Sequence, residues 1–110
     1  MTTVTVFQSP DGTLSGFDCR GHADFADAGE DIVCAALSSV IQTAALGLFR
    51  VAGLREVRIE RDDAAARFAI RVGALNKADR HDADTILETM LAGVADLHES
   101  FSKFIKLEVI

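Results

Sequence analysis

One segment limits the possible folds of this chain more than any other: a nearly uninterrupted apolar run at residues 32–51. Asp31 precedes it, where an N-cap residue accepts hydrogen bonds from the first helical turn, and Gly53 follows where helices commonly end. The sequence therefore predicts a helix over about 31–51. Because its apolar side chains fall on nearly every side, we expect it to be buried on most faces.

The same run is not expected to cross a membrane. Polar residues interrupt it before it reaches the roughly 18 apolar residues of a span. The first residues, 1–6, carry neither a basic segment nor a cleavage site for secretion. We therefore expect a cytoplasmic protein without a membrane partner, and in that reducing compartment Cys19 and Cys34 are expected to be free thiols rather than a disulfide.

Length and charge narrow the function. A chain of 110 residues is expected to form a single domain, 1–110, and 49% hydrophobic residues suffice for a core. The formal net charge of -6 argues against direct nucleic-acid binding, which needs a basic surface.

Alternation of polar and apolar residues predicts strands around this helix. Ser9–Gly12 forms a turn between the first two, and Arg61, Asp62 and Asp63 are expected to turn the chain between the next two. A second helix, about 79–99, carries an apolar stripe including Leu87 opposite Asp84. The predicted strands are 3–6, 14–19, 57–60, 67–72 and 105–109. The fold class is α+β, with two layers: a mostly antiparallel five-stranded sheet with two helices, in the order ββαββαβ.

Cys34 and His22 are the residues best placed for chemistry. Cys34 falls in the first turn of the predicted helix, where unpaired backbone N–H groups and the helix dipole favour an anion such as a thiolate. His22 lies in the preceding loop, and a cysteine with a histidine is the minimal nucleophile and base. Ser38 sits one helical turn after Cys34, and the amides at the helix start are candidates to receive an oxyanion.

Other interpretations of these residues remain open. A free cysteine on an apolar helix is often a small buried hydrophobe, and Asp31 can be a plain helix cap. The Cys19-x-x-His22 spacing also suits a metal site, with Cys34, His81 or His98 as candidates to complete it.

Two segments together resemble a family signature. Gly21-His22-Ala23, followed by Gly29-Glu30-Asp31-Ile32-Val33-Cys34-Ala35-Ala36-Leu37-Ser38, is similar to the pattern of the ribosomal-processing cysteine protease family (Prp). The sequence departs from that pattern visibly only at Leu37, where the family has valine.

The resemblance implies a bacterial cytoplasmic endopeptidase without cofactor or metal. Such enzymes remove an N-terminal extension from the precursor of the twenty-seventh large-subunit ribosomal protein, after a phenylalanine-containing hydrophobic stretch. It implies Cys34 as nucleophile, His22 as general base, and supporting roles for Asp31 and Ser38. It also implies a homodimer and a loop, residues 20–30, that moves to admit substrate.

In that loop, Gly21 and Gly29 are candidate hinges and Phe25 a candidate cover for the site. The stretch from Asp18 to Asp31 holds five carboxylates against Arg20, so we expect a negative rim that attracts basic ribosomal proteins. Two alternatives are a non-catalytic ribosome-associated binding module and a Cys/His metal-binding protein.

Overall fold

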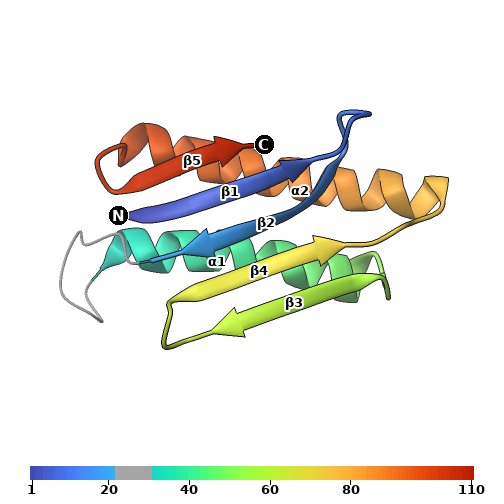
Figure 1. The fold of residues 1–110 in the computed structure, drawn as a ribbon, viewed down its shortest axis with the longest axis horizontal. Coiled ribbons are helices and arrows are strands. Elements are labelled where there is room, and N and C mark those ends of the chain that lie inside the picture. Colours follow the sequence, from blue (N-terminus) through green and yellow to red (C-terminus); the bar gives the residue numbers. More distant parts are fainter. Residues whose placement is uncertain (22–30) are drawn as a thin grey trace.

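The computed structural model describes residues 1–21 and 31–110, and it contains five strands and two long helices in the predicted order (Figure 1). A short π-helical segment, η1, continues the first helix. The elements are β1 (Thr2–Gln8), β2 (Leu14–Arg20), α1 (Ile32–Leu46), η1 (Gly47–Val51), β3 (Val57–Asp62), β4 (Arg67–Val72), α2 (Lys77–Ser100) and β5 (Ile105–Val109).

The strands form one mixed sheet in the order β3-β4-β2-β1-β5. Only the β1–β5 pair is parallel among the described residues, and the other three pairs are antiparallel. The two predicted hairpins are therefore confirmed, as is the mostly antiparallel sheet. The chain reaches the parallel position of β5 because α2 carries it back along the sheet before β5 begins.

Both helices cover the same face of the sheet (Figure 1). The register places Val6, Phe17 and Ile70 side by side across three strands, and all three are fully buried. Their neighbours one residue along, such as Thr5, point to the opposite face, which is largely polar. The two-residue repeat of the strands thus separates a helix-covered core from an open face.

The first helix differs from the prediction in how it is covered. Its buried side chains, including Val33, Leu37 and Ile41, lie on one face, whereas Ile32 and Val51 are 58% and 85% exposed. A two-layer domain covers only the side of a helix that faces the sheet and the neighbouring helix, so burial on most faces was wrong. Gly53 adopts a φ of +63° at the end of η1, as predicted.

By length and composition, Ile32–Val51 is also the one helix within 1–21 and 31–110 that is apolar enough to span a bilayer. Its buried side chains belong to the same core cluster as those of the sheet and α2, as expected for the core helix of a globular domain.

Two local predictions are corrected. The turn between β3 and β4 begins at Asp63, because Arg61 and Asp62 still pair with β4. Asp84, predicted on the polar side of the second helix, faces the sheet instead, where its Oδ1 accepts the backbone N–H of Leu14 at 2.8 Å. An acidic side chain at this position satisfies a strand amide that the sheet leaves unpaired.

Candidate active site

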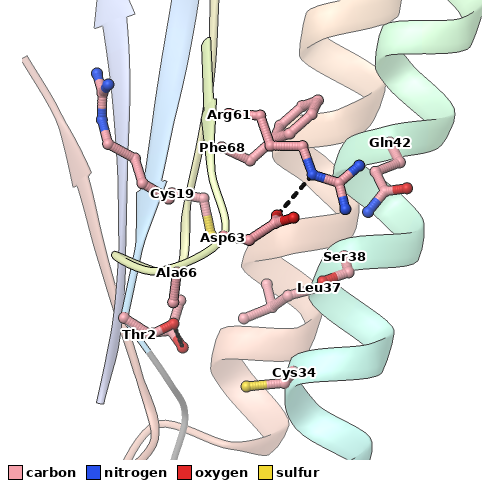
Figure 2. A pocket seen from close by; sticks show the side chains of 12 residues that line it. Thr2, Cys19, Cys34, Leu37, Ser38, Gln42, Arg61, Asp63, Ala66 and Phe68 are labelled. Atoms are coloured by element: carbon pink, nitrogen blue, oxygen red, sulfur yellow. Dashed lines mark hydrogen bonds and ion pairs between the residues drawn. The ribbon is translucent and has the colours of Figure 1, made fainter.

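A pocket of about 300 Å³ opens where β2 ends and α1 begins (Figure 2). Residues from three parts of the chain form it: the first turns of α1, the β3–β4 hairpin, and the adjoining ends of β1 and β2. Its lining residues are Thr2, Cys19, Gly21, Cys34, Leu37, Ser38, Gln42, Arg61, Asp63, Ala66, Arg67 and Phe68.

The half-buried Cys34 lies in the first turn of α1, and its side chain lines this pocket. Asp31 is the N-cap, as predicted: its backbone is extended, and its Oδ1 accepts the N–H groups of Val33 and Cys34, each at 3.0 Å. These bonds set where the helix starts, and thereby where the Cys34 sulfur emerges. The cap therefore positions the candidate nucleophile.

The same bonds correct the expectation about the oxyanion. The amides of Val33 and Cys34 already donate to the carboxylate of Asp31. An oxyanion at these two amides would compete with that carboxylate and be repelled by its charge. The helix start therefore contributes its dipole to this site, whereas these two N–H groups serve the cap.

Ser38 lies where its spacing predicts. It is one turn after Cys34, exposed, and lines the same pocket. Gln42 continues this row one turn further along α1 and also lines the pocket. Gln42 was not a candidate from the sequence, although its spacing of eight residues from Cys34 would have placed it on the same face.

Gly21 is held between β1 and the β3–β4 turn at the edge of the pocket. Its N–H donates to the carbonyl oxygen of Ala66 at 2.9 Å, and its own carbonyl accepts the hydroxyl of Thr2 at 3.3 Å. Its φ is +88°, and a Cβ here would lie 2.9 Å from the carbonyl oxygen of Met1. Both facts make glycine necessary at this position.

The predicted general base and two of the predicted loop residues lie outside the described residues. These are His22, Phe25 and Gly29. Their roles stay predictions, as do the contributions of Asp24, Asp27 and Glu30 to a negative rim.

Cys19 shares the pocket with Cys34 but differs in character. It follows Asp18 on β2 and faces the core, where burial raises the pKa of its thiol to about 11, with the nearby Asp18 and Cys34 adding to the effect. A thiol with such a pKa stays protonated at neutral pH and is a poor nucleophile. Both cysteines are free thiols in the structure.

Asp18 carries no unpaired charge, contrary to the expected negative rim. Its carboxylate accepts hydrogen bonds from Arg20 at 2.9 Å and from Arg67 at 2.8 Å, and Arg67 also bonds Glu60 at 2.8 Å. Burial alone would raise the pKa of Asp18, but the bonds from the two arginines outweigh it and lower that pKa. The five predicted carboxylates thus include one that is neutralised and one, Asp31, that caps a helix.

The β3–β4 hairpin supplies the wall that sequence reasoning missed. Nε of Arg61 donates to Oδ1 of Asp63 at 2.8 Å, and Phe68 lies beside Arg61 on the paired strand (Figure 2). Nothing local in the sequence links these residues to Cys34, because the hairpin meets α1 only through the packing of the sheet.

Of the candidate metal ligands, Cys19 and Cys34 line the same pocket, and His22 lies outside the described residues. His81 and His98 lie on α2 and are not among the pocket residues. Among residues 1–21 and 31–110, no group of three histidine, cysteine or acidic side chains could hold a metal ion.

Comparison with known proteins gives a consistent result. The family described as "Cysteine protease Prp" matches residues 1–106. A protein of Staphylococcus aureus (strain Mu50 / ATCC 700699) named "Ribosomal processing cysteine protease Prp" is 32% identical over 109 residues, 97% of each chain.

Two solved structures of the S. aureus protease Prp resemble the whole fold. One, in complex with a covalently linked product peptide, has a TM-score of 0.86 and 31% identity over 100% of both chains. The other, in complex with a substrate peptide, has a TM-score of 0.80 and 29% identity, again over 100% of both chains.

Proposed function

Since this chain belongs to the Prp family of cysteine proteases, we propose that it cleaves the precursor of a ribosomal protein, with Cys34 as nucleophile and His22 as general base. The observation that carries the proposal is the place of Cys34, at the start of α1 and in the wall of an open pocket. The helix dipole favours its thiolate there, and the pocket offers space for a peptide.

The proposed reaction has two stages. The Cys34 thiolate adds to the carbonyl carbon of the scissile bond; the C–N bond then breaks, and the leaving nitrogen takes a proton from the His22 imidazolium. A thioester remains. His22 next removes a proton from water, the hydroxide attacks the thioester, and Cys34 leaves as a thiolate, so that the first product gains a carboxylate.

Chain connectivity supports His22 as the base. Gly21, which precedes His22 in the chain, lines the pocket. We assign Asp31 a supporting role through the helix cap, and Ser38 a supporting role as a hydroxyl beside the nucleophile. We further propose that loop 20–30, with Gly21, Phe25 and Gly29, admits the substrate.

The proposed substrate is the precursor of the twenty-seventh large-subunit ribosomal protein, cut after an apolar, phenylalanine-containing stretch. The names of the S. aureus relatives, and the peptides bound in their two structures, support a ribosomal peptide substrate. An apolar pocket floor of Leu37 and Phe68 suits such a sequence. We place the reaction in the cytoplasm, without cofactor, nucleic acid or membrane, with residues 1–110 acting as one domain.

We also propose that the protein is a homodimer. The far end of α1 and η1 exposes Leu46, Phe49 and Val51, at 47%, 39% and 85%. Three large exposed apolar side chains within six residues of the chain support an interface at this end of the helix. Light scattering coupled to size exclusion measures the mass: 11.8 kDa for one chain would contradict the dimer.

Cleavage of a recombinant precursor tests the proposed function. The wild-type protein is expected to shorten the precursor, and mass spectrometry of both fragments identifies the bond. Cys34→Ser and His22→Ala should abolish or nearly abolish cleavage while retaining the wild-type circular dichroism. Cys19→Ser is the matched control, because Cys19 lines the same pocket yet is protonated at neutral pH.

The alternatives give different results in the same assay. A non-catalytic binding module would retain the precursor on a pull-down and leave it intact. A metal-binding protein would show a mass increase by native mass spectrometry that a chelator removes. Full cleavage by Cys34→Ser would refute the proposed nucleophile.

A further inference from the structure

Three side chains form an evenly spaced row along the exposed edge of α1. Cys34, Ser38 and Gln42 are each four residues apart, and all three line the pocket (Figure 2). A helix rises 1.5 Å per residue, so successive members of this row are about 6 Å apart along the axis. The pocket therefore extends at least two helical turns beyond the sulfur.

The opposite wall is also polar. Arg61 and Asp63 stand on the β3–β4 hairpin, with side chains 61% and 80% exposed. Nε of Arg61 is engaged with Asp63, and the rest of its guanidinium reaches across the pocket toward Gln42 (Figure 2). This bond orients a group with further N–H donors toward the space above the floor.

The floor between these walls is apolar. Leu37 is 2% exposed, and Phe68 packs against the core from β4. Hydrogen-bonding walls with an apolar floor suit an extended peptide, whose main-chain groups point sideways while alternate side chains point down. Two residues of an extended chain span about 6.6 Å, close to the step of the α1 row.

We propose that Gln42 and Arg61 are specificity-determining residues that bind the main chain of the substrate at about the fifth residue before the scissile bond. With the carbonyl of the first residue before the bond at Cys34, the third residue before the bond lies level with Ser38 and the fifth level with Gln42. The Gln42 amide both donates and accepts, as one peptide unit does to another, and Arg61 donates to a carbonyl oxygen from the opposite wall.

This inference rests on the proposed function, which supplies the nucleophile and places the apolar residues before the cleaved bond. It adds a binding register for the peptide: substrates long enough to reach Gln42 are expected to bind more tightly than shorter ones. The row on α1 sets the spacing, and the ion pair on the hairpin holds the second wall in place.

The test uses two synthetic peptides that share all residues after the bond identified in the precursor. One has five residues before that bond and reaches Gln42, and the other has three and ends level with Ser38. In wild type the longer peptide should have the higher kcat/KM. In Gln42→Ala and in Arg61→Ala, that advantage should fall about five- to tenfold, the range for loss of one or two hydrogen bonds, through a higher KM for the longer peptide.

Matched controls lie next to both residues. Thr43→Ala changes the neighbouring exposed position on α1, which does not line this pocket, and Arg58→Ala removes an arginine from the opposite face of β3. Both should keep the wild-type ratio between the peptides. Arg61→Lys should retain part of the advantage, because it keeps a donor without the planar guanidinium.

Binding to a Cys34→Ala background separates this inference from the proposed function. Fluorescence anisotropy should show tighter binding of the longer labelled peptide and a loss of that difference with Gln42→Ala. If the wild-type protein cleaves neither peptide but this binding pattern is observed, the binding roles of Gln42 and Arg61 are supported and the proposed function is refuted. An unchanged length dependence in Gln42→Ala and Arg61→Ala, or no binding of either peptide, would overturn the inference.

Discussion

Replacing Asp31 separates its role as a helix cap from any direct role in the chemistry. Its carboxylate accepts two N–H groups at the start of α1, including that of Cys34. Asp31→Ala leaves both amides to water. Loss of an N-cap side chain costs about 1 kcal/mol, within a range of roughly 0.5–2. For a domain of this size we expect Tm to fall by about 4–8 °C.

Asp31→Asn distinguishes the two roles. Asparagine caps helices nearly as well as aspartate, so this variant should recover at least half of the lost stability. It also removes a negative charge beside Cys34, and loss of that charge favours the thiolate form of Cys34. If Asp31 acts only as a cap, kcat/KM of Asp31→Asn should equal or exceed that of the wild type.

Thermal unfolding by circular dichroism and peptide cleavage well below the lowest Tm together decide this point. Asp31→Ala is expected to lose stability and, because the position of Cys34 relaxes, to lose activity as well. Two results would refute the reasoning. A wild-type Tm for Asp31→Ala would show that the cap contributes nothing, and an inactive but stable Asp31→Asn would show that the charge itself takes part in catalysis.

Three further predictions follow from the pocket and its surroundings. Iodoacetamide at pH 7 should label Cys34 in preference to Cys19, because a pKa of about 11 leaves the Cys19 thiol protonated; equal labelling by peptide mass spectrometry would contradict this. Asp18→Asn should lower the free energy of unfolding by about 2 kcal/mol at pH 7 in urea titrations. The pKa of Asp18 is lower in the folded than in the unfolded state, where it is about 4. The stability that the Asp18 carboxylate contributes is therefore present above that unfolded value and is lost as the pH falls below it. The free energy of unfolding of Asp18→Asn should accordingly depend less on pH than that of the wild type between about pH 5 and 3. Gly21→Ala should lower both Tm and activity more than Gly12→Ala. Both glycines have a φ near +90°, but only a Cβ at position 21 would come close to another atom, the carbonyl oxygen of Met1 at 2.9 Å. Equal effects of the two substitutions would exclude that contact as a cause.

Local sequence patterns were sufficient to predict the element order, the hairpins and the cap at Asp31. Each of these depends on residues close together in the chain: alternation along a strand, or a carboxylate two and three residues before the amides it accepts. The family signature around Cys34 is local for the same reason. The errors arose where burial depends on distant elements, as for the exposed side of α1 and for Asp84, which bonds a strand amide 70 residues earlier.

The residues that form the walls of the pocket could be identified only from the tertiary structure. Arg61 and Phe68 lie opposite Cys34 because β4 pairs with β2 and the sheet packs on α1, contacts that carry no signal in a short stretch of sequence. The same packing buries Cys19 beside Cys34, and this burial raises the pKa of the Cys19 thiol to about 11. Sequence near Cys34 could predict its place at a helix start, because a helix start is a local structure. The surroundings of the sulfur depended on long-range packing, because elements far apart in the chain supply them.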